Sequence, residues 1–223
     1  MLPVYKWYGD VPLYLYPPTL DKLRAEIVKR YGSLKRAREY IRKQFKCYLS
    51  ENAIWKRIVR VPVDEYEEPP VEPKLSLAVV MVRGARKDFN YIEYLMSKGL
   101  PVNPYSYAGE GECFGFYCKG DFTIIDRVVG ELAMNKLIKG AIIVNAVWYA
   151  RLNRRVNLAR LSNTGLFVPS TSSFKMVSGV IETAKVAVFH TGTVRIVRAL
   201  TPEQAREILG KVYAIMRRHG AIQ

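Results

Sequence analysis

Residues 174–197 read FKMVSGVIETAKVAVFHTGTVRIV and contain two β-branched runs, each with a phenylalanine near its start. Side chains alternate between the two faces of a strand, so Ala187 and Phe189 share one face, which Arg195 and Val197 continue after a turn. The valines and the isoleucine between them are expected to face a helical layer. The stretch therefore predicts antiparallel strands with one buried face and one open face that is small and largely apolar.

The order of the expected elements repeats after residue 74. Residues 75–140 indicate a strand, a helix, a strand-rich stretch and a second helix, and residues 141–223 indicate the same order again. The last helix has one continuous apolar face, with Thr201 as its N-cap and Gly220 at its end. The predicted fold class for this part is α+β, a duplicated antiparallel sheet with helices on one face.

These segments have a counterpart in a known family. Asn145 and Val147 match an Asn-x-Val pair carried on a strand, and LNRRVNLARL at 152–161 matches an LGRxLDLxxL-type turn into a helix. STSSFKMV at 170–177 is similar to YNPxxFPGLV, and AVFHTGTVRIVRALTPEQA at 187–205 to LIFSSGKVVVTGAKSEEEA. In these segments the chain resembles one repeat of the TATA-box-binding protein family, a saddle of two such repeats, and the resemblance covers residues 75–223.

The resemblance implies DNA binding and bending through the minor groove. In that family, paired phenylalanines wedge between base steps while Asn and small β-branched residues read an A·T-rich groove. The implied wedges are Phe174 and Phe189, and the implied groove readers are Asn145, Val147 and Val197.

Several positions depart from the family pattern. In the first half Tyr107 and Phe116 stand at the wedge positions, and Ser76 replaces the Asn. Arg195 replaces a Val of the groove face, which implies an altered base preference or an arginine turned onto phosphate. Taken singly, strand aromatics pack in cores more often than they contact ligands, so the wedge assignment depends on the ordered succession of matching segments.

The chain is strongly basic, with 35 Lys and Arg against 20 Asp and Glu, a formal net charge of +15 and a pI near 9.8. This balance favours a polyanionic partner, because each neutralised phosphate releases counterions. Duplex DNA is the expected partner, with transcription factors or RNA polymerase as further partners and no membrane.

A cytoplasmic location is expected because no apolar run is long enough to cross a bilayer. No cofactor and no metal are expected, since the three cysteines and two histidines are scattered.

Charge and proline content divide the chain. Residues 1–62 are predicted to form a helical domain, 63–73 an acidic proline-rich linker, and 74–140 and 141–223 the two repeats. Helical spacing within 19–31, 33–45 and 50–59 resembles a helix-turn-helix.

On the helix-turn-helix interpretation, Lys35 and Arg36 hold phosphates, while Asn52, Trp55 and Lys56 meet base edges. A small helical bundle with a solvated basic face is the alternative.

Three other functions remain open. A basic sheet with aromatic side chains can stack the bases of RNA or single strands. A sheet of this kind can also serve as a protein-interaction module that binds no DNA. An enzyme acting on nucleic acid is the third, although no carboxylate cluster, activated nucleophile or phosphate-binding loop is visible, so the protein is not expected to be an enzyme.

Overall fold

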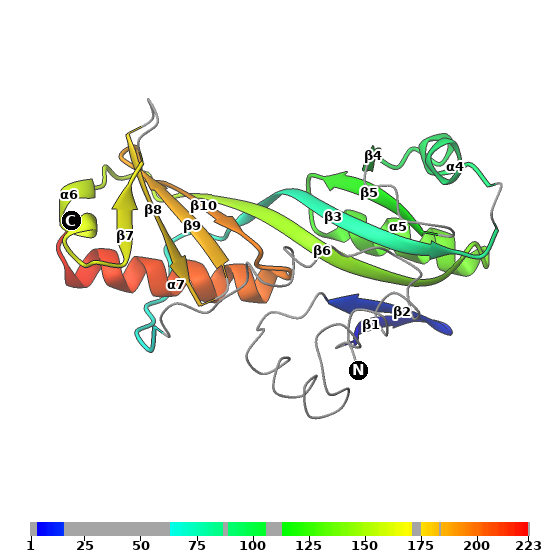
Figure 1. Ribbon diagram of the computed structural model, residues 1–223, viewed down its shortest axis with the longest axis horizontal. Coiled ribbons are helices and arrows are strands. Elements are labelled where there is room, and N and C mark those ends of the chain that lie inside the picture. The colour runs from blue at the N-terminus through cyan, green and yellow to red at the C-terminus, as the bar shows by residue number, and fades with distance from the viewer. Residues whose placement is uncertain are drawn as a thin grey trace, which may run out of the picture. The chain divides into compact units, whose positions relative to one another are not determined.

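The computed structural model describes residues 4–15, 63–86, 89–105, 113–170, 175–182 and 184–222 (Figure 1). These residues form ten strands and four helices. They divide between two compact units, one containing residues 4–15 and 77–145 and the other residues 63–76 and 146–222. Each unit combines an antiparallel sheet with helices.

The sheet of the first unit has the strand order β4-β5-β3-β6. β5 pairs antiparallel with both β3 and β4, so that Phe116 lies directly opposite Val80 on one side and Pro104 on the other. The strands are β3 (Lys74–Gly84), β4 (Val102–Tyr105), β5 (Cys113–Lys119) and β6 (Ile138–Arg151).

Two helices, α4 (Tyr91–Ser97) and α5 (Thr123–Met134), cover one side of this sheet. The ring of Tyr91 lies 4.6 Å from that of Phe114 on β5, and the Tyr91 hydroxyl donates to the carbonyl of Leu137 at 2.8 Å. Asn90 is the N-cap of α4, and its side chain accepts a hydrogen bond from the Glu93 amide. The helices therefore lie on the side of the sheet to which the even-numbered residues of β3 and β5 point.

The structure corrects the predicted fold class at the N-terminus. β1 (Val4–Tyr8) and β2 (Val11–Leu15) form a hairpin with Gly9 at positive φ in its turn, and β2 pairs parallel with β6. A helical domain spanning residues 1–62 is therefore wrong, because residues 4–15 form strands that join the first unit's sheet. The signal was present in VYKWYGDVPLYL, where β-branched and aromatic residues flank a Gly-Asp turn.

The hairpin is fastened to α5 by polar and aromatic contacts. The Tyr8 hydroxyl donates to Asp126, which also forms an ion pair with Lys6 at 3.0 Å. The Tyr5 ring meets the edge of Phe122 with centroids 6.0 Å apart. Burial and the hydrogen bond to Asp126 raise the pKa of Tyr8 well above its usual value, so the phenol stays protonated and remains a donor.

The second unit continues from β6 in the order β6-β10-β9-β8-β7, antiparallel throughout. A short helix, α6 (Leu158–Ser162), precedes the edge strand, and its N-cap Asn157 accepts from the Arg160 amide. The strands are β7 (Phe167–Pro169), β8 (Met176–Ile181), β9 (Ala184–Phe189) and β10 (Thr193–Val197).

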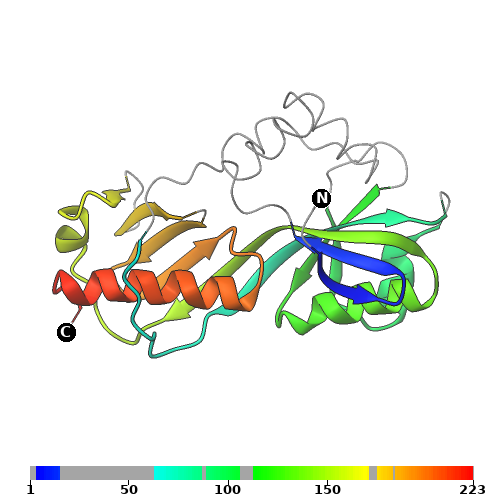
Figure 2. The ribbon, with the colours of Figure 1, turned by 90° about the horizontal axis from the view of Figure 1, so that it is seen from below.

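A long helix, α7 (Pro202–Arg218), lies along one side of β8, β9 and β10, as Figure 2 shows. The Thr201 side chain caps it by accepting from the Gln204 amide, and the chain leaves it at Gly220 with φ 59°, as predicted. Beneath it, the Trp148 indole donates to the Ala199 carbonyl at 2.7 Å and is almost fully buried. The helix and this strand side form the core of the unit.

Residues 63–73 form neither helix nor strand and pack against α7 within the second unit. Val63 and Pro69 are buried, and the Glu67 amide donates to the Gly210 carbonyl at 3.3 Å. We refer to residues 63–73 as the acidic strap. In the described residues, no helix is long and apolar enough to cross a membrane.

Candidate nucleic-acid interface

The strands of the second unit have one side buried and one side open. Val188, Val194 and Ile196 are fully buried beside α7, as the alternation predicted, and so is Val186. The residues between them point to the other side, which no described helix of this unit covers (Figure 2). We call this side the open face.

Side chains cross the open face in rows set by the strand register. The middle row consists of Tyr149, Arg195, Ala187, Ser178 and Val168. Direct cross-strand neighbours have Cβ atoms about 4.5–5.5 Å apart, so this row is a continuous strip. At its two ends, Tyr149 is 37% exposed and Val168 is 65% exposed.

The rows on either side contain three of the sequence-predicted residues, Val147, Val197 and Phe189. One row consists of Val147, Val197, Lys185 and Val180. In the other, Phe189 lies opposite Met176, and both are partly exposed. The structure thus brings Val147, Phe189, Arg195 and Val197 to one face, on which Val147 is only 8% exposed. Phe174 lies outside the described residues.

The charge of the open face is of one sign. Arg151, Lys185 and Arg195 are exposed on it. The strands β7 to β10 and residues 146–151 of β6 contain no Asp or Glu. A polyanion that approaches these strands therefore meets three cationic side chains, and the strands themselves contain no carboxylate to repel it.

The outer part of the face contains a shallow depression. Gly179 lies on the helix-facing side of β8 beside Phe167, where a Cβ would collide with the Leu166 carbonyl, so it admits the edge strand closely. Next to it lies a hollow of about 290 Å³ whose lining includes Val168, Ser178, Val180 and Lys185. The face can therefore receive a broad, gently curved surface, with one lysine beside a shallow depression.

Asn145 lies on β6 two residues before Val147, at the end of the first unit. Its Oδ1 is buried without a hydrogen-bond partner among the described residues. A buried amide oxygen of this kind is uncommon, because nearly all such atoms are paired in native structures. Only the amide nitrogen of this side chain could therefore reach a ligand.

The first unit does not repeat this arrangement. Phe116, predicted at a wedge position, is 0% exposed and lies on the helix-covered side with Val80, so its placement on an open face is wrong. On the opposite side Val79 and Met81 are also buried, at 5% and 2% exposed. Tyr107 lies outside the described residues. In the described part of the chain, the open face belongs to the second unit.

Other predicted nucleic-acid contacts also fall outside the described residues: Lys35, Arg36, Asn52, Trp55 and Lys56. Several open-face residues were not among the predicted site residues, including the exposed Tyr149, Arg151 and Lys185. Alternation places all three on this face, because Lys185 precedes Ala187 by two residues and Tyr149 and Arg151 follow Val147 in steps of two.

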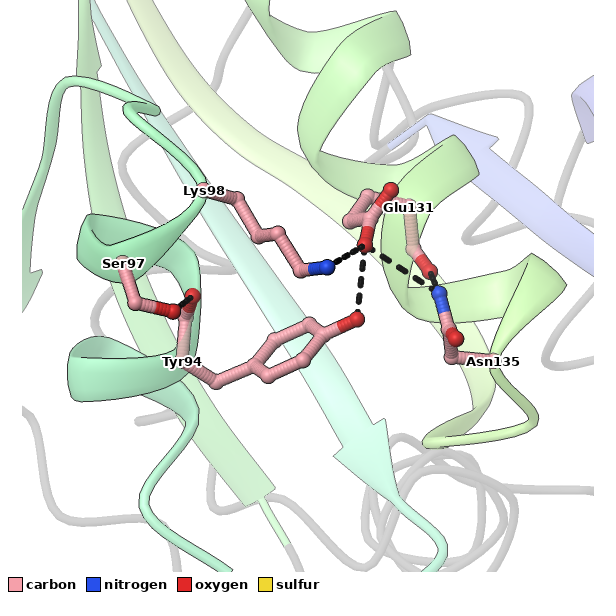
Figure 3. A network of polar contacts seen from close by, with 5 residues as sticks. All are labelled: Tyr94, Ser97, Lys98, Glu131 and Asn135. Atoms are coloured by element: carbon pink, nitrogen blue, oxygen red, sulfur yellow. Dashed lines mark hydrogen bonds and ion pairs between the residues drawn. The ribbon is translucent and has the colours of Figure 1, made fainter.

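A polar cluster in the first unit connects its two helices. Glu131 of α5 accepts from the Tyr94 hydroxyl at 2.6 Å and from Asn135 at 3.2 Å, and forms an ion pair with Lys98 at 3.8 Å (Figure 3). The hydrogen bond to Glu131 raises the pKa of Tyr94, so its hydroxyl remains a donor. This cluster joins α4 to α5.

The described residues include no group of three or more His, Cys, Asp or Glu side chains placed to hold a metal ion. Cys118 is buried, and burial raises the pKa of its thiol to about 12. A thiol of this kind is protonated at neutral pH and is a poor metal ligand or nucleophile.

The described residues thus define an α+β protein of two sheet-and-helix units, one of which has an open cationic strand face. No protein-family model matches the sequence, and no curated protein matches it. Among solved structures, the chain is similar to Methanococcus jannaschii TBP, with a TM-score of 0.48 and 18% identity over 66% of this chain and 99% of that chain. It is also similar to Clostridium acetobutylicum aspartate kinase, with a TM-score of 0.25 and 7% identity over 69% of this chain and 37% of that chain. Because both TM-scores are low, function is inferred from the open face itself.

Proposed function

We propose that the open face binds duplex DNA through the minor groove and bends it, as a binding protein and not an enzyme. One observation carries the proposal: the strand register gathers Val147, Val197, Arg195 and Phe189 on one open face whose strands contain no carboxylate. A flat strand surface with small side chains and cations suits a minor groove, where apolar contacts meet the sugars and arginine meets the narrow, negative groove. A role in transcription, with protein partners, belongs to this proposal.

The apolar character of the face favours DNA over RNA. An RNA minor groove displays 2′-hydroxyls, and Val147, Val197 and Ala187 offer them no hydrogen-bond partner. Burying such hydroxyls against aliphatic side chains costs free energy. A duplex of deoxyribose sugars has no such group to leave unpaired.

Phe189 is positioned to act as a wedge. It ends β9 and projects from the row that it shares with Met176, two residues beyond the flat strip around Ala187. Unstacking a base step costs a few kcal/mol, which phosphate contacts by Arg151, Lys185 and Arg195 would offset. Phe174, two residues before Met176 in the sequence, is proposed as its companion.

Asn145 would add selectivity for A·T pairs. Because its Oδ1 is buried, the side chain can present only a donor to a ligand. In the minor groove A·T pairs display acceptors alone, whereas a G·C pair adds a donor that this amide nitrogen cannot satisfy.

The test measures binding and bending together on the full chain. A short duplex with a central TA step carries fluorophores at its two ends, and energy transfer is followed during titration with wild type and with Phe189→Ala. The proposal expects bending by wild type, and binding by Phe189→Ala with a markedly smaller increase in transfer. The double variant Phe174→Ala/Phe189→Ala should abolish the bend.

Met96→Ala is the matched control, because Met96 is an exposed apolar residue of α4 and lies outside the open face. It should bend the duplex as wild type does. Equal bending by wild type and the double variant would rule out the wedge. Tighter binding of single-stranded or RNA oligonucleotides than of the duplex would instead make the face a base-stacking platform.

A further inference from the structure

The acidic strap is paired with the basic residues of α7. Arg206 binds two of its carboxylates, Glu68 through Nε at 3.0 Å and Glu72 through Nη1 at 2.9 Å. Arg218 forms an ion pair with Glu65, and Arg217 forms one with Glu67 at 3.6 Å. Arg206 near the start of α7, and Arg217 and Arg218 at its end, are therefore each paired with a carboxylate of the strap.

Between these ion pairs, the aromatic ring of Tyr66 in the strap packs against Gly210 of α7. Gly210 lies in the middle of α7, and a Cβ there would stand 2.7 Å from Cδ2 of Tyr66, too close for any side chain. The Tyr66 hydroxyl donates to Glu68 at 2.8 Å, and the hydrogen bond from Arg206 holds the pKa of Glu68 below its usual value. The strap is thus docked in a defined register along α7.

Without the strap, the outer side of α7 would be cationic. The helix contains four basic residues, Arg206, Lys211, Arg217 and Arg218, and two acidic ones, Glu203 and Glu207. Lys211 is already paired with Glu207 at 3.0 Å and with Glu182. The three arginines are the groups that a second polyanion could bind, and the strap supplies five carboxylates and no base.

We infer that the outer face of α7 is a latent polyanion-binding surface and that the acidic strap occupies it, so that nucleic acid is directed to the open face. This inference rests on the proposed function, since it assigns the strap a part in choosing which side of the second unit binds DNA. Charge complementarity supports it: the carboxylates take the positions at the guanidinium groups that phosphates would otherwise take. If the strap did not cover α7, its arginines would compete with the open face for the same duplex through phosphate contacts that are independent of base sequence.

The test uses the full chain with Glu65→Gln/Glu67→Gln/Glu68→Gln, which removes three strap charges and keeps the side-chain shape. A photoreactive residue replaces either Thr193 on the open face or Glu203 at the exposed start of α7. Wild type should crosslink a duplex from position 193 and not from 203. The strap variant should add a crosslink at 203 and bind a second duplex, raising the stoichiometry from one towards two.

The charge-matched control is Asp10→Asn/Glu93→Gln/Asp121→Asn, which removes three exposed carboxylates that lie outside the strap and form no ion pair with a described residue. It should behave as wild type does. A strap variant that crosslinks and binds as this control does would overturn the inference, as would a wild-type crosslink at 203.

Heparin separates failure of the inference from failure of the proposed function. In the background Lys185→Ala/Arg195→Ala, which weakens the open face, the strap variant should bind heparin several-fold more tightly than the charge-matched control. If heparin affinity rises in this way while no protein crosslinks DNA from 193, the latent surface stands and the proposed DNA function fails. If DNA crosslinks from 193 and heparin affinity does not rise, the proposed function stands and the inference fails.

Discussion

The ring of Tyr66 occupies the notch that Gly210 leaves in the middle of α7, where a Cβ would stand 2.7 Å from Cδ2 of the ring. Glycine is a poor helix former, and its use here is explained by the ring that it admits. The Glu67 amide, next in sequence, donates to the carbonyl of the same glycine. One position of α7 thus receives both a side chain and a backbone donor from the acidic strap.

Gly210→Ala should therefore destabilise the wild-type chain and stabilise the chain that lacks the ring. In wild type the added methyl expels Tyr66, and overpacking of this kind costs about 1–3 kcal/mol. In the background Tyr66→Ala the notch is empty, and the gain in helix propensity should raise the free energy of unfolding by about 1 kcal/mol. Urea unfolding of wild type, Gly210→Ala, Tyr66→Ala and the double variant measures the change in the free energy of unfolding that Gly210→Ala causes in each background.

A matched control places alanine at a helical glycine whose neighbouring ring, that of Tyr8, leaves room for a Cβ. Gly130 on α5 has its nearest neighbour atoms at 3.6 Å, so an added Cβ makes ordinary contact. Gly130→Ala should be neutral or stabilising whether or not Tyr66 is present. If Gly210→Ala changes the free energy of unfolding in the same direction with and without the Tyr66 ring, the packing of the ring does not depend on the absence of a side chain at residue 210.

Acid should release the contact between Glu68 and Arg206. Hydrogen bonds from Arg206 and Tyr66 lower the pKa of Glu68 from its usual 4.5. A carboxyl with a lowered folded-state pKa stabilises the fold fully above its unfolded pKa, and this stabilisation is lost as pH falls through the folded value. The free energies of unfolding of wild type and Glu68→Gln should therefore differ by a constant amount above about pH 5 and converge below pH 4.5. Urea unfolding between pH 3 and 7 tests this; a difference independent of pH would contradict it.

Much of the second unit could be predicted from the sequence, because its signals are local. Alternation in AVFHTGTVRIV assigns Val188, Val194 and Ile196 to the core, and Thr201 and Gly220 mark the two ends of α7. The structure confirms each of these placements. The same alternation places Arg195 and Val197 on the open face, although their part in binding stays a prediction.

The N-terminal hairpin and the acidic strap could not be placed in the same way, since both depend on distant partners. β2 is held by a parallel pairing with β6, about 130 residues away in sequence, which no local pattern encodes. The strap has the composition of a linker, and only the arginines of α7 and the notch at Gly210 give it a fixed place. Phe116 was misplaced because strand alternation alone does not say which of two faces the helices cover.

The turn before β10 should depend on Gly192. Its φ is 85°, and a Cβ there would collide with the Arg154 carbonyl, so an alanine is strained and also obstructed. Gly192→Ala should lower the free energy of unfolding by at least about 1 kcal/mol. Gly165 is the control, because it is also at positive φ but has no neighbour within 4 Å. Gly165→Ala should lower the free energy of unfolding only by the cost of placing alanine at positive φ. Equal losses at the two positions in urea unfolding would exclude the contact with Arg154.

Each cation of the open face should contribute to the salt dependence of DNA binding. A cation that neutralises one phosphate adds about 0.9 to the slope of log K against log salt concentration, so Arg195→Ala or Lys185→Ala should reduce the slope by about one. Arg127→Ala removes the same charge from an exposed position of α5, on the helix side of the first unit, and should leave the slope unchanged. Fluorescence anisotropy of a labelled duplex between 50 and 300 mM salt measures all three slopes. Because net charge falls equally in the three variants, an equal reduction in each would mean that DNA responds to total charge alone and that the open face is not its binding surface.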